Sequence, residues 1–331
     1  MRRFFARPSI RRTRSQQGTE IARERPSFEP TLGTSGDLSP VRIAHLTDLH
    51  FSTAPASRYP SGPEVLQHAV SRLNSLDLDA VLVTGDLFDD AESLGPEIPV
   101  FNAIMRELRH PWFAALGNHD VEGEHTTRRK LQLIESLEDW GLSQAGQPYY
   151  DLRLKPGVRL VVLDTTDTED AHYRCWRGFF SPKQARWLDG VLADASDEVV
   201  LVALHHPPVA PFPLMDSLKF ADADKKRLGA TLSAHPNVAA LLCGHFHMAG
   251  WQPFGLAHVL TGPGLIEFPH QFRTLEVRSS DGAIRFDTHL VPVPEHVVRR
   301  SERLRSYFFG RLSGGHAGRI EMVEGLWAAS S

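Results

Sequence analysis

Five short apolar segments of the sequence are each followed at once by residues that can bind a metal ion. Their side chains are carboxylates, imidazoles and one amide, and oxygen and imidazole donors favour Mn, Fe, Zn or Co over soft ions such as Cu(I). One such residue at the end of an apolar segment is most often an ordinary hydrogen-bonded side chain. Five in order along the chain are difficult to explain by packing. The residues concerned are Asp48 and His50; Asp86; Asn118, His119 and Asp120; His205 and His206; and His245 and His247.

The segments that precede these residues predict buried β-strands. Each is short and rich in Leu or β-branched residues, as expected for strands that are covered on both faces. In open α/β sheets a ligand site forms at the carboxyl ends of the strands. We therefore expect the five strand ends to converge. The predicted strands span residues 41–47, 80–84, 112–116, 199–204 and 238–243, and a sixth without such a cluster spans 159–163.

Amphipathic segments between the strands predict helices, and strand–helix alternation indicates a layered α/β domain. The predicted helices span residues 61–76, 96–108, 127–140, 181–195 and 220–234. Ser61 is the predicted N-cap of the first helix, with Pro63 in its first turn. After residue 243 only strands are predicted, at 250–254, 257–261, 272–278 and 283–290, and Asp281-Gly282 is typical of the hairpin turn between the last two.

The two ends of the chain differ in composition from the segment between them. Residues 1–40 hold eight Arg and four acidic residues and are rich in Pro, Ser, Thr and Gly, which predicts a disordered basic tail outside the fold. A single domain is expected at residues 41–293. Residues 294–331 are expected to form a C-terminal helix, as far as about residue 309, and then a weakly ordered tail.

Composition excludes several classes of protein. The longest apolar runs, such as residues 199–204, are far below the ~18 residues that span a bilayer, so no membrane span is expected. Two cysteines, Cys175 and Cys243, cannot form a disulfide framework, which favours a cytoplasmic location. The formal charge of −4, with its basic part concentrated in the tail, argues against a nucleic-acid partner for the domain.

The number of candidate ligands indicates more than one metal ion. Four histidines, two aspartates and one asparagine are too many ligands for one closed tetrahedral site. They suit two metals about 3.5–4 Å apart and bridged by a carboxylate, which is an arrangement that clamps both the attacking and the leaving oxygen of a phosphoryl group. Asp86 is the natural bridge, because its strand is expected to lie between the other ligand-bearing strands.

The order D-x-H, G-D, G-N-H-D, H-H-P and G-H-x-H, from Asp48 to His247, resembles the calcineurin-like metallophosphoesterase family. The resemblance implies a four-layer αββα sandwich of two sheets flanked by helices, with a dinuclear site at one edge. It also implies that a hydroxide bridging the metals is the nucleophile. Catalytic roles would fall to Asp86 and to His119, the latter contacting phosphate and assisting the leaving group. By this pattern Asp48, His50, Asp86 and His247 hold one metal, and Asp86, Asn118, His205 and His245 hold the other.

Several nearby residues have alternative interpretations. Alternation along a strand points His205 and His206 in different directions, and the family pattern selects His205. His45 is expected to be a packed neighbour, Cys243 a buried apolar residue and Asp164 a turn cap. Asp120 would either orient His119 or cap the following segment. Three residues would bind a substrate phosphate or simply face solvent: His172, Arg174 and Arg177.

A narrower resemblance, carried by H-H-P-P and by G-P-G-L-I-E-F-P at residues 262–269, is to bacterial cyclic-nucleotide and glycerophosphodiester phosphodiesterases. It implies a metal-dependent hydrolase whose substrate is a small phosphodiester. The alternatives on the same fold are a phosphomonoesterase or protein phosphatase, a nuclease guided by the Arg-rich tail, and an inert interaction scaffold. Scaffolds of this kind typically lose ligands, whereas this chain has lost none.

Overall fold

The computed structural model describes the central part of the chain. The described residues are 23–24, 39–54, 57, 59, 61–122, 126–138, 146–166, 176–211, 216, 219–280 and 283–293. Most of the expected N-terminal tail, the predicted Asp281-Gly282 turn and the expected C-terminal helix and tail at 294–331 lie outside the described residues.

The first of two six-stranded sheets has the order β1-β12-β11-β2-β3-β4. Its β2, β3 and β4 run parallel to one another, and β11 pairs antiparallel with both β2 and β12. Strand β3 therefore lies between β2 and β4, as expected for the strand that precedes Asp86. The strands are β1 (Arg23–Glu24), β2 (Val41–Leu46), β3 (Ala80–Thr84), β4 (Trp112–Ala115), β11 (Gln271–Ser280) and β12 (Ala283–Pro292).

The second sheet has the order β5-β6-β7-β8-β10-β9. Its four central strands are parallel, and antiparallel β5 and β9 form the two edges. The strands are β5 (Tyr150–Lys155), β6 (Val158–Val162), β7 (Val199–Ala203), β8 (Val238–Cys243), β9 (Gly250–Phe254) and β10 (Ala257–Thr261).

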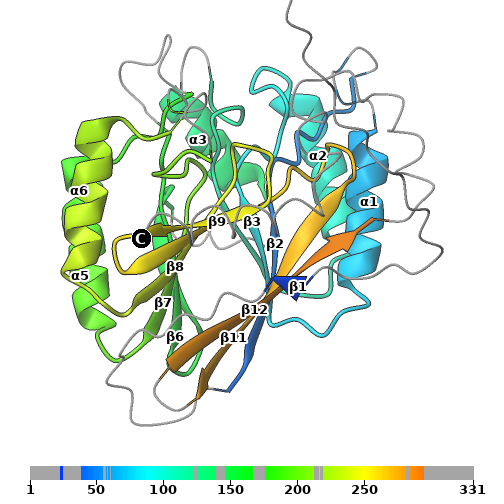
Figure 1. Ribbon diagram of the computed structural model, residues 1–331. Helices are drawn as coiled ribbons and strands as arrows, with labels where there is room; N and C mark the ends of the chain where they lie inside the picture. The colour runs from blue at the N-terminus through cyan, green and yellow to red at the C-terminus, as the bar shows by residue number, and fades with distance from the viewer. Residues whose placement is uncertain are drawn as a thin grey trace, which may run out of the picture.

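Helices cover the outer faces of the two sheets (Figure 1). The two faces of β7 pack against different layers. Val200 and Val202 pack in a cluster with residues of α5 and α6. Leu201 and Ala203 belong to a cluster with residues of both sheets and of α1 and α2. The predicted four-layer αββα architecture is thereby confirmed. The helices are α1 (Gly62–Leu73), α2 (Leu94–Met105), α3 (Thr126–Ser136), α5 (Pro182–Asp194) and α6 (Asp222–Ser233).

Two helix starts differ in their capping. At α5 the Ser181 hydroxyl accepts a hydrogen bond from the Gln184 amide at 3.0 Å, so the serine is an N-cap. At α1 the predicted Ser61 occupies the N-cap position, but its side chain makes no cap hydrogen bond. Its ψ of 7° departs from the extended conformation that aims an N-cap oxygen at the first turn.

Two strands were not predicted. Strand β5 pairs antiparallel with β6, and β1 pairs with β12 through Arg23 opposite His289 and Glu24 opposite Thr288. Arg23 and Glu24 belong to residues 1–40 and join the first sheet, and the expectation for the rest of that segment stays a prediction. None of the helices that the structure describes is long and apolar enough to cross a membrane.

Candidate metal centre

The loops after β2 and β3 lie side by side and bring their acidic and imidazole residues together. The Asp48 amide donates to the Gly85 carbonyl at 3.1 Å, and the His50 amide donates to the Asp86 carbonyl at 2.9 Å. These hydrogen bonds continue the parallel β2–β3 register beyond the strands. They place Asp48, His50 and Asp86 at one edge of the first sheet.

Five of the candidate ligands adopt left-handed backbone conformations. Their φ values are +51° at Asp48, +39° at His50, +50° at Asp86, +72° at His245 and +54° at His247. This conformation costs roughly 1–2 kcal/mol for a residue with a side chain. Such strain persists only where the surrounding structure over-determines it, and it clusters at functional sites. The backbone is thus bent to aim these side chains at a common centre.

The glycine before Asn118 allows the third strand end to approach. A β-carbon at Gly117 would lie 2.2 Å from both the amide nitrogen and Oδ1 of Asp86. That separation is far inside van der Waals contact, so only glycine lets the β4 loop pass this close to Asp86. The glycine of the G-N-H-D motif is therefore required for steric reasons, whereas the residues that follow it supply the chemistry.

Asp48, His50, Asp86 and His247 form a first donor set. Each offers a ligand atom, and these atoms all lie within 4.8 Å of one another. Nε2 of His50 is 3.1 Å from Nε2 of His247, which is 3.2 Å from Oδ1 of Asp48. Nε2 of His50 is 3.7 Å from Oδ2 of Asp86. All four side chains are buried.

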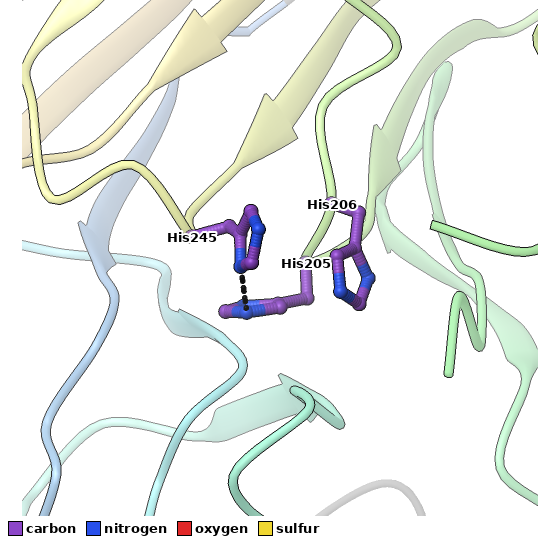
Figure 2. A group of neighbouring side chains, drawn as sticks. All are labelled: His205, His206 and His245. Atoms are coloured by element: carbon purple, nitrogen blue, oxygen red, sulfur yellow. Dashed lines mark hydrogen bonds between the residues drawn. The ribbon is translucent and has the colours of Figure 1, made fainter. Parts of the chain in front are cut away.

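Asp86, Asn118, His205 and His245 form a second donor set around one nitrogen. Nε2 of His205 lies 3.1 Å from Oδ1 of Asn118, 3.3 Å from Oδ2 of Asp86 and 3.2 Å from Nδ1 of His245. Figure 2 shows the two imidazoles facing each other from the ends of different strands. The structure thus brings together all seven residues that the sequence nominated.

The partners of the outer histidine nitrogens show that this cluster suits cations. Nδ1 of His50 faces Asp89 at 3.3 Å, Nδ1 of His247 faces Glu267 at 3.1 Å, and Nδ1 of His205 faces the Thr84 carbonyl at 2.8 Å. The Thr84 carbonyl accepts a hydrogen bond from Nδ1 of His205, and the carboxylates of Asp89 and Glu267 favour a proton on the Nδ1 atoms that they face. The three Nε2 lone pairs then point at one another or at other acceptors. Buried imidazole nitrogens and carboxylate oxygens that face one another in this way form a set of ligands that fits metal ions.

The carboxylates and imidazoles of the two donor sets shift one another's pKa values. Burial disfavours the charge on Asp48, but His247 and His205 outweigh it and lower the pKa of Asp48 to about 2. Burial likewise opposes the charge on His205, but Asp86 and Asp48 outweigh it and raise the pKa of His205 to about 9. Burial and the neighbouring His205 lower the pKa of His245 to about 3. A metal ion in the second donor set would have to displace the proton of His205.

His119 stands beside the donor sets. Its amide donates to Oδ1 of Asp86 at 2.8 Å, and its Nδ1 donates to the Asp89 carbonyl at 2.9 Å. Its ring stands edge-on to that of His50, with 4.7 Å between centroids. Burial opposes the charge of its imidazole, but Asp86 and Glu122 outweigh it and raise the pKa of His119. The ring therefore presents Nε2 as the nitrogen that can reach a substrate.

The structure decides between the readings of three further residues. Asp120 accepts from the Phe88 amide at 2.9 Å and from the Gly117 amide at 2.8 Å, so it ties the β3 and β4 loops together and does not orient the His119 ring. Asp164 caps its turn by accepting from the Thr166 amide at 3.0 Å. His45 hydrogen-bonds the Thr84 hydroxyl at 2.8 Å, as expected for a packed neighbour.

His206 lies closer to the second donor set than the sequence suggested. One ligand atom from each of His205, His206 and His245 fits within 4.8 Å of the others (Figure 2). Nδ1 of His206 is 2.9 Å from the Thr165 hydroxyl. Cys243 is buried as expected, and burial raises the pKa of its thiol. His172 and Arg174 lie outside the described residues.

Asp89 and Glu267 were not predicted, although both hold candidate ligands. Asp89 follows Asp86 closely in G-D-L-F-D, and Glu267 lies in the G-P-G-L-I-E-F-P segment. Oε1 of Glu267 also accepts from the Tyr59 hydroxyl at 3.2 Å. Carboxylates that hold the outer nitrogen of a histidine ligand fix its orientation and raise its basicity.

Replacing Glu267 by glutamine is expected to weaken binding of one metal about 10- to 100-fold, because a neutral amide makes His247 a poorer donor. Metal content after dialysis against buffered Mn²⁺ measures the change. Glu97→Gln is the matched control: Glu97 is a buried carboxylate that accepts from the Ser52 hydroxyl at 2.7 Å and contacts no candidate ligand. Equal metal affinity in the two variants would contradict the role given to Glu267.

Comparison with known proteins places this geometry in a family. Residues 41–249 match the calcineurin-like phosphoesterase family. The glycerophosphodiester phosphodiesterase GpdQ of Enterobacter lignolyticus is 27% identical over 231 residues, which cover 68% of this chain and 77% of that protein. The 3′,5′-cyclic adenosine monophosphate phosphodiesterase CpdA of Escherichia coli K12 is 26% identical over 279 residues, which cover 78% of this chain and 92% of that protein.

A solved structure supports the fold independently. A dimetal phosphatase from Danio rerio superposes with a TM-score of 0.58 at 18% identity, covering 77% of this chain and 99% of that one. The family match spans more than half of the 331 residues and contains every one of the converging strand ends. The chain belongs to the calcineurin-like phosphoesterase family and is a phosphoric ester hydrolase.

Proposed function

We propose that this protein is a dinuclear metal phosphodiesterase that hydrolyses a small phosphodiester. Asp48, His50, Asp86 and His247 would hold one metal, and Asp86, Asn118, His205 and His245 the other. Imidazole and oxygen donors without a thiolate suit Mn, Fe, Zn or Co. When bound, such a pair supplies a nucleophilic water at neutral pH and positive charge for the phosphoryl oxygens.

The position of one oxygen carries this proposal. Oδ2 of Asp86 lies 3.3 Å from Nε2 of His205 and 3.7 Å from Nε2 of His50, so it faces a histidine of each donor set. Oδ1 is occupied by the His119 amide at 2.8 Å, which fixes the carboxylate plane. A carboxylate shared by two donor sets is what a two-metal clamp requires. A single closed site would leave the second set of donors without a purpose.

His119 and Asn118 would have different roles. His119 would donate a proton or hydrogen bond from Nε2 to the leaving oxygen, since its Nδ1 is held by the Asp89 carbonyl. Asn118, its neighbour, would bind a metal through Oδ1, because a carbonyl oxygen suits a hard cation better than an amide nitrogen. The two adjacent side chains thus divide metal binding and proton transfer between them.

A phosphodiester is favoured as substrate by two relatives. GpdQ and CpdA, which align with 68% and 78% of this chain, are named as phosphodiesterases. The formal charge of −4 does not favour a polyanionic nucleic acid over a small ester. A cytoplasmic location is part of the proposal and is supported by the low cysteine content, two in 331 residues.

Removing the metals with a strong chelator is expected to abolish hydrolysis, and adding Mn²⁺ or a similar ion is expected to restore it. Bis(p-nitrophenyl) phosphate, p-nitrophenyl phosphate and 3′,5′-cyclic AMP should be compared as substrates at equal metal occupancy. The proposal expects higher kcat/KM for the diesters. Full activity in a preparation shown to be metal-free would overturn the metal mechanism, and exclusive monoester hydrolysis would overturn the phosphodiesterase assignment.

A further inference from the structure

Trp176 stands at the edge of the candidate metal centre with much of its indole open to solvent. It is 46% exposed, and its ring contacts that of His119 with 5.7 Å between centroids and an interplanar angle of 74°. His119 in turn contacts His50. The indole is therefore one imidazole ring away from a candidate metal ligand. Among the large hydrophobic side chains exposed in the described part of the chain, it is the only aromatic one.

A single exposed apolar side chain is ordinary on a protein surface. Trp176 differs because the backbone that follows it is held in place by residues close to the site. The Phe179 amide donates to the Thr165 carbonyl at 2.9 Å. A β-carbon at Gly178 would lie 2.7 Å from Cβ of His206 and from Cδ2 of Phe220, so the chain passes here only as glycine. The indole is thus attached to a clamped segment, which reduces the entropy lost when a ligand stacks on it.

The chemistry of the exposed ring indicates what it binds. An indole face stacks on any planar π-system, and stacking of a nucleic-acid base on an aromatic side chain contributes substantially to binding. In a nucleotide one sugar separates the base from the phosphate. In this protein the imidazole of His119 separates the indole from the donor sets. Recognition of a quaternary ammonium group would instead use a cage of several aromatic side chains. Among the described residues, Trp176 is the one exposed aromatic side chain whose ring contacts His119.

We propose that Trp176 is a specificity-determining residue whose indole stacks on the base of a nucleotide substrate, such as a 3′,5′-cyclic nucleotide, while its phosphate lies at the metal centre. This inference rests on the proposed phosphodiesterase function and selects one class among its substrates. A glycerophosphodiester has no base, so it gains nothing from this platform.

The test compares 3′,5′-cyclic AMP with glycerophosphoethanolamine, using holoenzyme of the wild type, Trp176→Ala and Trp176→Phe. We expect Trp176→Ala to lower the ratio of kcat/KM for cyclic AMP to that for glycerophosphoethanolamine about 5- to 100-fold. The change should lie mainly in the KM for cyclic AMP. Trp176→Phe should retain most of the preference, because a benzene ring also stacks. Leu256→Ala, which removes a 56% exposed side chain from the β9–β10 turn, should leave both substrates unaffected.

Two results would overturn the role of Trp176. An equal loss for both esters would show that the indole only supports His119. A selective loss for glycerophosphocholine, assayed as a third ester, would show a cation site instead. If the wild type hydrolyses monoesters alone, the proposed function fails separately. Trp176 is then tested by inhibition of that hydrolysis: Trp176→Ala should weaken inhibition by 5′-AMP at least fivefold more than inhibition by ribose 5-phosphate, and equal weakening would reject the platform.

Discussion

Asp86→Asn is expected to lose both metals and to lower kcat by about 10³-fold or more, since metal ions contribute several kcal/mol to stabilising a phosphoryl transition state. Oδ2 of Asp86 lies within 3.7 Å of a histidine nitrogen from each donor set. Asparagine keeps the size of the side chain and tolerates the left-handed conformation at this position, where φ is +50°. The substitution therefore removes the negative charge with little change to the backbone.

Metal content per chain, measured together with kcat, distinguishes a bridging carboxylate from an ordinary ligand. His50→Ala should reduce occupancy of mainly one metal, because His50 belongs to one donor set. Asp164→Asn is the matched control: it is also a buried aspartate after a parallel strand, but its carboxylate caps a turn by accepting from Thr166. It should keep both metals. Retention of one fully occupied metal in Asp86→Asn would show that Asp86 is not shared.

The convergence of the ligand-bearing strand ends could be predicted because it follows from topology. Strands β3 and β8 begin and end at the predicted residues, and both are buried along their whole length. Apolar runs of this kind are defined by composition alone. Parallel pairing within each sheet then places the carboxyl ends of its strands at one edge. The expected position of β3 between other ligand-bearing strands, which the order of the first sheet confirms, was the reason for choosing Asp86 as the bridge.

Strand β5 was missed because it is an edge strand with mixed composition. Tyr150 is buried, but charged residues such as Arg153 and Lys155 alternate with its apolar residues. The alternation, followed by Pro156-Gly157 at the turn into β6, was the signal that could have found it. Strand β1 carries no comparable signal, because it is two residues long and both residues are charged.

The residues that orient the ligands were missed for a different reason. Glu267 reaches His247 from a segment with no periodic pattern, and Asp89 reaches His50 across two loops. No spacing rule links a carboxylate to the outer nitrogen of a particular histidine. Such contacts depend on side-chain directions that appear only when the loops are folded. The local sequence thus determines which side chains can bind a metal, whereas the orientation of these side chains depends on tertiary contacts.

His119 provides the second large effect, and its prediction separates proton transfer from metal binding. His119→Ala is expected to keep near-normal metal content, since the amide that donates to Asp86 is retained in alanine. It should lower kcat about 10²- to 10⁴-fold for an alkyl diester, the range typical of general acid catalysis. The loss should be smaller for bis(p-nitrophenyl) phosphate, whose leaving group scarcely needs a proton.

Asn118→Ala is the comparison that gives this result its meaning. Oδ1 of Asn118 lies 3.1 Å from Nε2 of His205, inside the second donor set, whereas Nδ1 of His119 is bound to the Asp89 carbonyl outside it. Asn118→Ala should therefore lower occupancy of one metal and impair both esters alike. Two neighbouring residues would then show opposite signatures in metal content and leaving-group dependence. If His119→Ala loses metal, or slows both esters equally, His119 is not the leaving-group acid.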